Sequence, residues 1–175
     1  MLEPDVVFRE FASEIGKVTP WPQAMTGRTS AVMAALHKVA QSTPTGARKI
    51  YYRNCPEPNS YEFMLDFCCM DANSNEMLLA AESEWGEGDG QVEDDFQKLV
   101  YIKAGIKMMI YGNNRPSEID RPSEIERIRK FLNSYPRNEP GDTYVLAYVN
   151  WEGTVKGLKL TINQDRVVGE PVPII

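Results

Sequence analysis

The sequence predicts an α/β fold: a mixed β-sheet with an αβββαβ core, flanked by helices and followed by a C-terminal β-hairpin. Apolar residues recur at helical spacing in some segments, apolar or alternating runs of strand length lie between them, and turn residues separate the two patterns. We expect one domain over residues 1–175, with the core at about 29–111 and a C-terminal helix and hairpin at 121–163.

The N-terminal part of the chain predicts two helices and a strand. Residues 6–15 carry an apolar stripe at helical spacing, and the prolines that follow end this first helix. The second helix is expected to begin at Thr29 or Ser30, since either residue suits an N-cap, and to run to Ala40. Residues 49–53 then form a short strand.

A β-hairpin is predicted next, and it sets the position of the acidic residues. Residues 61–70 and 77–85 are both typical of strands, and the polar cluster at 71–75 between them is typical of a turn. A turn centred on the middle of that cluster sets Asp66 opposite Glu82.

The second hairpin strand is expected to carry carboxylates on one face. Because side chains alternate along a strand, one face presents Leu78, Ala80, Glu82 and Glu84. With Asp66 opposite, three carboxylates converge, and like charges facing each other destabilise a sheet. Mg²⁺ or Mn²⁺ would offset this repulsion. In the alternative interpretation the register is shifted by one residue, or this face is solvated.

The segment after the hairpin predicts a helix and a buried strand. Asp94 and Gln97 have the spacing of a capping box, so we expect a helix that opens there and ends near Ala104. Residues 106–111 are nearly all apolar, as expected for a central strand.

The C-terminal part predicts a last helix and two strands. The helix begins at Pro122 and reaches Tyr135. Strands at 143–151 and 155–162 are joined as a hairpin, and the tail from Asp165 onward is either an ordered edge or a loose end.

Composition excludes several classes of protein. A net charge of −6 argues against nonspecific coating of nucleic acid, and basic residues are scattered. Three cysteines without CxxC spacing favour a reducing cytoplasm over a disulfide framework or a zinc site. No apolar run is long enough to span a bilayer, so no membrane partner is expected. The only histidine, His37, has no accompanying GxSxG motif, which argues against histidine-based serine or cysteine hydrolases.

The αβββαβ order with Asp66 on the second strand and Glu82 on the third resembles the PD-(D/E)XK nuclease-like superfamily, also called the restriction-endonuclease-like fold, over about residues 29–111. The resemblance implies Mg²⁺ bound by Asp66 and Glu82. This sequence departs from the family pattern at Glu84, which stands where the family has a lysine. In some members the lysine lies on the following helix, where Lys98 is the candidate.

The resemblance implies a nuclease that hydrolyses phosphodiester bonds, with Asp66, Glu82 and Glu84 as metal ligands and Lys98 stabilising phosphate charge. Glu10 or Glu14 is a further candidate carboxylate. The alternative for Lys98 is a solvated lysine paired with Asp94 or Asp95.

Two other interpretations of the whole chain remain. The first is a catalytically inactive domain of the same fold that serves as a protein-interaction or accessory module. The second is an unrelated small α/β protein with solvent-facing carboxylates. A side chain of Lys98 directed at the pocket of Asp66 and Glu82 favours the enzyme, and one directed outward favours the module. Because the cations are scattered, nucleic acid binding is expected to need a homodimer, a protein partner or a small substrate.

Overall fold

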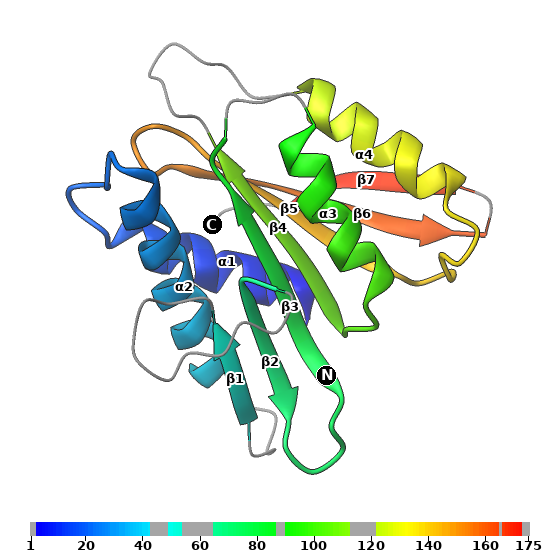
Figure 1. Ribbon diagram of the computed structural model, residues 1–175, viewed down its shortest axis with the longest axis horizontal. Helices are drawn as coiled ribbons and strands as arrows, with labels where there is room; N and C mark the ends of the chain where they lie inside the picture. The colour runs from blue at the N-terminus through cyan, green and yellow to red at the C-terminus, as the bar shows by residue number, and fades with distance from the viewer. Residues whose placement is uncertain are drawn as a thin grey trace.

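The computed structural model describes residues 3–42, 49–53, 65–86, 90–112, 122–164 and 166–172. Its elements follow the predicted order and confirm the α/β fold class (Figure 1). In chain order they are α1 (Pro4–Gly16), α2 (Met25–Ser42), β1 (Lys49–Arg53), β2 (Phe67–Asp71), β3 (Met77–Glu84), α3 (Gln91–Tyr101), β4 (Ile106–Gly112), α4 (Pro122–Ser134), β5 (Thr143–Val149), β6 (Val155–Asn163) and β7 (Arg166–Val172).

The strands form one seven-stranded sheet in chain order, from β1 to β7. β1, β2 and β3 are antiparallel, β3, β4 and β5 are parallel, and β5, β6 and β7 are antiparallel again. The predicted β5–β6 hairpin is present, and the C-terminal tail forms the edge strand β7. The carboxyl ends of the three parallel strands β3, β4 and β5 therefore lie at the same end of the sheet.

Two layers of helices cover the sheet, with α1 and α2 on one face and α3 and α4 on the other (Figure 1). Each layer encloses its own apolar core. The first core includes Phe8, Phe11, Leu36, Met108 and Val145. The second includes Phe96, Leu99, Met109, Tyr144 and Leu146. The alternate residues of β4 and β5 divide between the two cores, as the period of a strand requires. None of the helices in the described part of the chain has the length and apolar character needed to span a bilayer.

Two predicted helix starts are wrong. α2 begins at Met25, and Ser30 Oγ donates to the carbonyl oxygen of Thr26 at 2.9 Å, so its hydroxyl bonds within the helix instead of capping it. α3 begins at Gln91, directly after Gly90, which has a left-handed backbone conformation with φ of 91°. The backbone N–H of Asp94 already donates to the carbonyl oxygen of Gly90, which places Asp94 inside the helix.

The face assignment along β3 is wrong at one residue. Cys69 pairs with Leu79, whereas the next residue, Met70, pairs with Met77, so Leu78 is the extra residue of a β-bulge. Leu78 consequently packs against the first core, while Ala80 lies in the second. Beyond the bulge the alternation is regular, and Glu82 follows Ala80 toward α3.

Gly112, at the end of β4, is a position where we expect substitution to be strongly unfavourable. A Cβ there would overlap the carbonyl oxygen of Val149 and lie 2.7 Å from Cζ3 of Trp85. Because backbone cannot move aside easily, Gly112→Ala is expected to destabilise the protein by about 1–3 kcal/mol in urea unfolding. Gly16→Ala is the matched control, since nothing lies within 4 Å of its Cβ position. Equal stabilities for the two variants would contradict this prediction.

Candidate functional site

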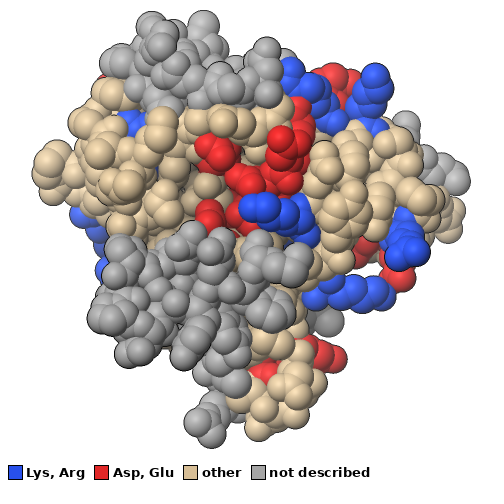
Figure 2. All heavy atoms as spheres, viewed as in Figure 1, with Lys and Arg blue, Asp and Glu red and all other residues tan. Residues whose placement is uncertain are grey.

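The acidic residues singled out from the sequence lie at the carboxyl end of β3, beneath α3. Figure 2 shows acidic side chains gathered at the centre of this face, with a basic side chain against them. The cluster consists of Asp66, Glu82, Glu84, Asp95 and Lys98, as the contacts of these residues show. The residues come from the position just before β2, from β3 and from α3.

Asp66 lies immediately before β2 and not on it, which corrects the predicted strand. The last paired residues are Phe67 and Ala81, so the next position places Asp66 opposite Glu82, as predicted. Asp66 Oδ2 accepts hydrogen bonds from the backbone N–H and the hydroxyl of Ser83, at 2.9 and 2.8 Å. The carboxylate thus takes the N–H that a strand carbonyl would otherwise bind, and the ladder ends there.

Glu82 is the most buried of these acids, since its side chain is only 2% exposed. Burial and the charge of Asp66 raise the pKa of Glu82 to about 8, although Lys98 acts in the opposite direction. Oε1 of Glu82 faces Lys98 Nζ across 3.5 Å and accepts no well-formed hydrogen bond within the described residues. This carboxylate is held where its negative charge is poorly compensated.

Lys98 makes both of the contacts considered for it from the sequence, one with an acid of the pocket and one with an aspartate on its own helix. Its Nζ lies 2.7 Å from Asp95 Oδ1, as expected for an i,i+3 pair on a helix, and it also faces Glu82. Burial acts to lower the pKa of Lys98, but the hydrogen bond with Asp95 and the charge of Glu82 outweigh it and raise the pKa. The ammonium therefore stays charged at neutral pH, and Asp95 orients it toward the pocket.

The carboxyl group of Glu84 lies close to that of Asp95. Burial raises the pKa of Glu84, and the contact with Asp95 acts in the same direction, while the backbone N–H of Gly86 donates to Glu84 Oε1 and opposes the shift. Glu84 was predicted to share a face of β3 with Glu82, and its contact with Asp95 of α3 agrees with that position.

Asp95 belongs to the cluster and Ser83 adjoins it through Asp66, although the sequence analysis assigned neither residue a role in the site. Asp95 was considered only as a surface partner of Lys98. Its spacing of three residues from Lys98 is a usable signal, because such residues share a helix face. Ser83 gave no comparable signal, since its contact with Asp66 depends on where the β2–β3 ladder ends.

The donor chemistry of the cluster fits a hard divalent cation. Among the described residues, no three histidine, cysteine, aspartate or glutamate side chains lie close enough together to hold a metal ion as they stand. Mg²⁺, however, is held by one or two carboxylates together with waters and substrate phosphates, so a complete protein cage is not required. The buried Oε1 of Glu82, with Asp66 opposite, supplies oxygen ligands of the required type.

The other candidate carboxylates lie elsewhere. Glu10 accepts a hydrogen bond from Ser42 at 2.7 Å, and Glu14 pairs with Lys17 and Lys38. All of these residues lie on or next to α1 and α2, which cover the opposite face of the sheet. The structure therefore does not bring Glu10 or Glu14 to the cluster.

The tryptophans pack mainly inside the protein. Trp21 and Trp85 are buried, and their ring centroids lie 6.2 Å apart in an edge-to-face arrangement. The guanidinium of buried Arg28 lies 4.7 Å from the ring centroid of Trp151 and 5.8 Å from that of Trp85. These aromatics therefore pack near the carboxyl end of β3. Because Trp21 and Trp85 are buried, they offer no exposed surface on which a base could stack.

The fold and this cluster together define an α/β protein with four carboxylates and one lysine gathered over the third strand of a mixed sheet. Comparisons with protein-family models, with curated proteins and with solved structures found no match to this chain. Its function must therefore be argued from the residues themselves.

Proposed function

We propose that the protein is a metal-dependent nuclease that hydrolyses phosphodiester bonds in nucleic acid. The observation that carries the proposal is the direction of Lys98, whose ammonium faces Glu82 across 3.5 Å. Burial and Asp66 shift the titration of Glu82, as is common at functional sites. The arrangement resembles the PD-(D/E)XK superfamily in the variant where the helix after the third strand supplies the lysine.

Each residue has a distinct role in this proposal. Asp66 and Glu82, with waters and substrate oxygens, would hold Mg²⁺ or Mn²⁺, which when bound would polarise the phosphate and lower the pKa of water, and Glu84 lies next to this pair on β3. Lys98 would hold the phosphate and stabilise the charge that develops on its oxygens, because it stays protonated. Asp95 orients Lys98, and Ser83 fixes the carboxylate of Asp66.

A catalytically inactive domain of the same fold, acting as an interaction module, is the second candidate. Two observations favour it. The shorter contact of Lys98 is with Asp95, at 2.7 Å, and Glu84 stands where the resemblance expects a lysine. We also propose a reducing, cytoplasmic setting, because the three cysteines of the sequence have neither the pattern of a disulfide framework nor CxxC spacing.

Isothermal titration of Mg²⁺ and Mn²⁺ into the protein tests the metal site. Wild type is expected to bind saturably, and Asp66→Ala and Glu82→Ala are expected to weaken binding by at least roughly tenfold, since each removes an oxygen ligand. Glu76→Ala, an exposed acid in the β2–β3 turn, is the matched control and should bind as wild type does.

A cleavage screen on single-stranded, duplex and branched DNA and RNA with each metal completes the test. Cleavage by wild type and its loss in both site variants would support the nuclease. Unchanged metal binding in correctly folded Asp66→Ala and Glu82→Ala variants would reject the metal site and leave the interaction module ahead.

A further inference from the structure

Three aromatic side chains cluster at the carboxyl ends of α3 and α4, one of them exposed and two partly buried, and the proposed chemistry does not use them. Tyr101, the last residue of α3, is 63% exposed, which is unusual for so large a side chain. Its ring centroid lies 5.5 Å from that of Tyr135 in an edge-to-face arrangement, and Tyr135 stacks on Phe131 at 6.0 Å. We call Tyr101, Phe131 and Tyr135 the aromatic platform.

The platform lies next to the candidate catalytic cluster along the same helix. Lys98 and Tyr101 are three residues apart on α3, so their side chains are neighbours on its surface, about 4.5 Å apart along the axis. Lys98 in turn faces Glu82. A nucleotide with its base on Tyr101 would therefore place an adjacent phosphate close to Lys98.

Exposed cations occur close in sequence to each residue of the platform. Lys103 follows Tyr101 by two residues, Lys130 directly precedes Phe131, and Arg137 follows Tyr135 by two residues; all three are exposed. Lys103 is paired with Glu139, but both side chains are largely in water, at 89% and 65% exposure, so this pair is readily exchanged for a phosphate. Three exposed cations at the ends of the same two helices would suit a phosphate backbone, although the whole chain is acidic.

We propose that the aromatic platform binds unpaired bases of single-stranded nucleic acid and thereby presents the neighbouring phosphodiester to the cluster around Glu82. The proposal rests on the proposed nuclease function and adds its substrate class. Single strands are the expected form because stacking on an exposed ring needs a base whose face is free, and bases within a duplex already stack on one another.

Fluorescence anisotropy with labelled single-stranded DNA, single-stranded RNA and the corresponding duplexes, in EDTA to prevent cleavage, tests the platform. Wild type is expected to bind single strands more tightly than duplexes. Tyr101→Ala is expected to raise the Kd for single strands roughly 5- to 100-fold, because the variant loses the stacking of one base on an aromatic ring. Tyr101→Phe keeps the ring and should bind nearly as wild type does.

Met25→Ala is the matched control for exposed apolar area, because Met25 is 49% exposed on α2, which covers the opposite face of the sheet. It should leave the Kd unchanged. Equal affinity of wild type and Tyr101→Ala, or no binding of single strands, would overturn the platform. The platform would also be overturned if sedimentation showed that wild type is a dimer and that Tyr101→Ala is a monomer, since a second copy of the chain would then cover this surface.

The two proposals fail separately. Metal-dependent cleavage by wild type, together with unchanged binding in Tyr101→Ala, would reject the platform and leave the nuclease. Binding of single strands that depends on Tyr101, without metal binding or cleavage, would reject the nuclease and leave a binding module for single-stranded nucleic acid.

Discussion

Replacing Glu82 with glutamine is expected to stabilise the metal-free protein at alkaline pH by roughly 2 to 4 kcal/mol. The side chain of Glu82 is only 2% exposed, and burial together with the charge of Asp66 raises its pKa from 4.5 to about 8. Glutamine has nearly the same shape and carries no charge, so it removes the penalty of an ionised buried carboxyl group without opening a cavity.

The pH dependence of this effect has a definite sign. In the unfolded chain Glu82 loses its proton near pH 4.5, whereas the folded protein keeps it until about pH 8. The folded state therefore binds more protons between these values, and the free energy of unfolding of wild type falls as pH rises through that window. Below the window both side chains are neutral and the difference between wild type and Glu82→Gln should vanish.

Urea unfolding of wild type and Glu82→Gln near pH 4 and near pH 9, with EDTA, measures the difference. Glu76→Gln, an exposed acid in the β2–β3 turn, is the control and should show no such pH-dependent gain. Excess Mg²⁺ should then stabilise wild type and not Glu82→Gln, because the ion binds only the folded protein. A variant less stable than wild type near pH 9 would contradict the prediction.

The sheet was predicted well where the pattern of apolar residues alone decides the structure. β4 is nearly all apolar and lies buried at the centre of the sheet, and β1 has the predicted bounds. The helix starts were missed because a residue type that suits an N-cap can also lie inside a helix, as Ser30 does when its hydroxyl donates to the carbonyl oxygen of Thr26. The bulge at Leu78 leaves no mark in the sequence, since an extra residue changes pairing and not composition.

The candidate site was only partly predictable for a different reason. The opposition of Asp66 and Glu82 follows from the position of one turn, so the hairpin sequence contains the information. The contact between Lys98 and Glu82 depends on how α3 packs across β3, which no local pattern specifies. Asp95 joins the cluster through the same packing. The placement of these residues is described by the structure, while their catalytic role stays a prediction.

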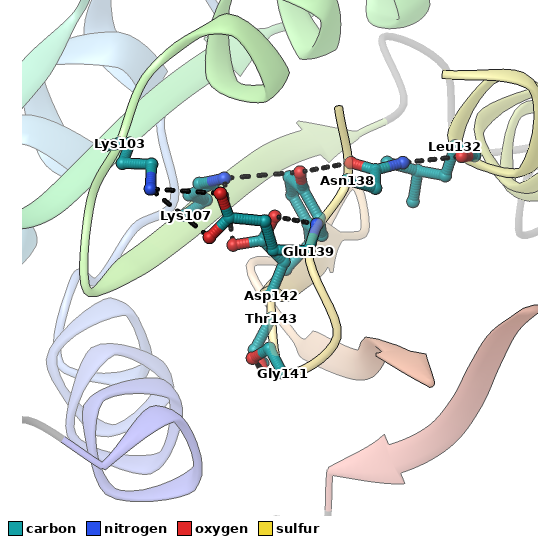
Figure 3. Close-up of polar contacts among 9 residues, drawn as sticks. Lys103, Lys107, Leu132, Asn138, Glu139, Gly141, Asp142 and Thr143 are labelled. Atoms are coloured by element: carbon teal, nitrogen blue, oxygen red, sulfur yellow. Dashed lines mark hydrogen bonds and ion pairs between the residues drawn. The ribbon is translucent and has the colours of Figure 1, made fainter. Parts of the chain in front are cut away.

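A second charged group is buried on the same face of the sheet, at Lys107 of β4, which is 4% exposed. Its Nζ donates to the hydroxyl of Tyr144 at 3.3 Å and lies 3.7 Å from Asp142 Oδ1 and 4.7 Å from the Tyr144 ring centroid. Figure 3 shows how Asn138 and Glu139 extend these contacts toward α4 and Lys103. The network attaches the segment before β5 to β4, and it removes Lys107 from the cations available to a phosphate backbone.

Burial lowers the pKa of Lys107, while Asp142 opposes the shift, so the ammonium is held at an energetic disadvantage. We therefore expect the packing of the lysine stem to contribute more than its charge. Lys107→Ala empties the space of the stem and is expected to destabilise the protein by about 2–4 kcal/mol. Lys107→Met fills the same space without the charge and should lie within about 1 kcal/mol of wild type, because Tyr144 still donates to Asn138 and Asp142 is partly in water.

Urea unfolding near neutral pH compares the two variants. Lys103→Ala is the control for an exposed lysine of the same network, and it should leave the free energy of unfolding unchanged. The folded protein releases the Lys107 proton at lower pH than the unfolded chain, whose lysines titrate near 10.5. Raising the pH toward that value should therefore stabilise wild type relative to Lys107→Met. Equal losses for Lys107→Met and Lys107→Ala would instead assign the stabilisation to the ammonium and its contacts with Asp142 and Tyr144.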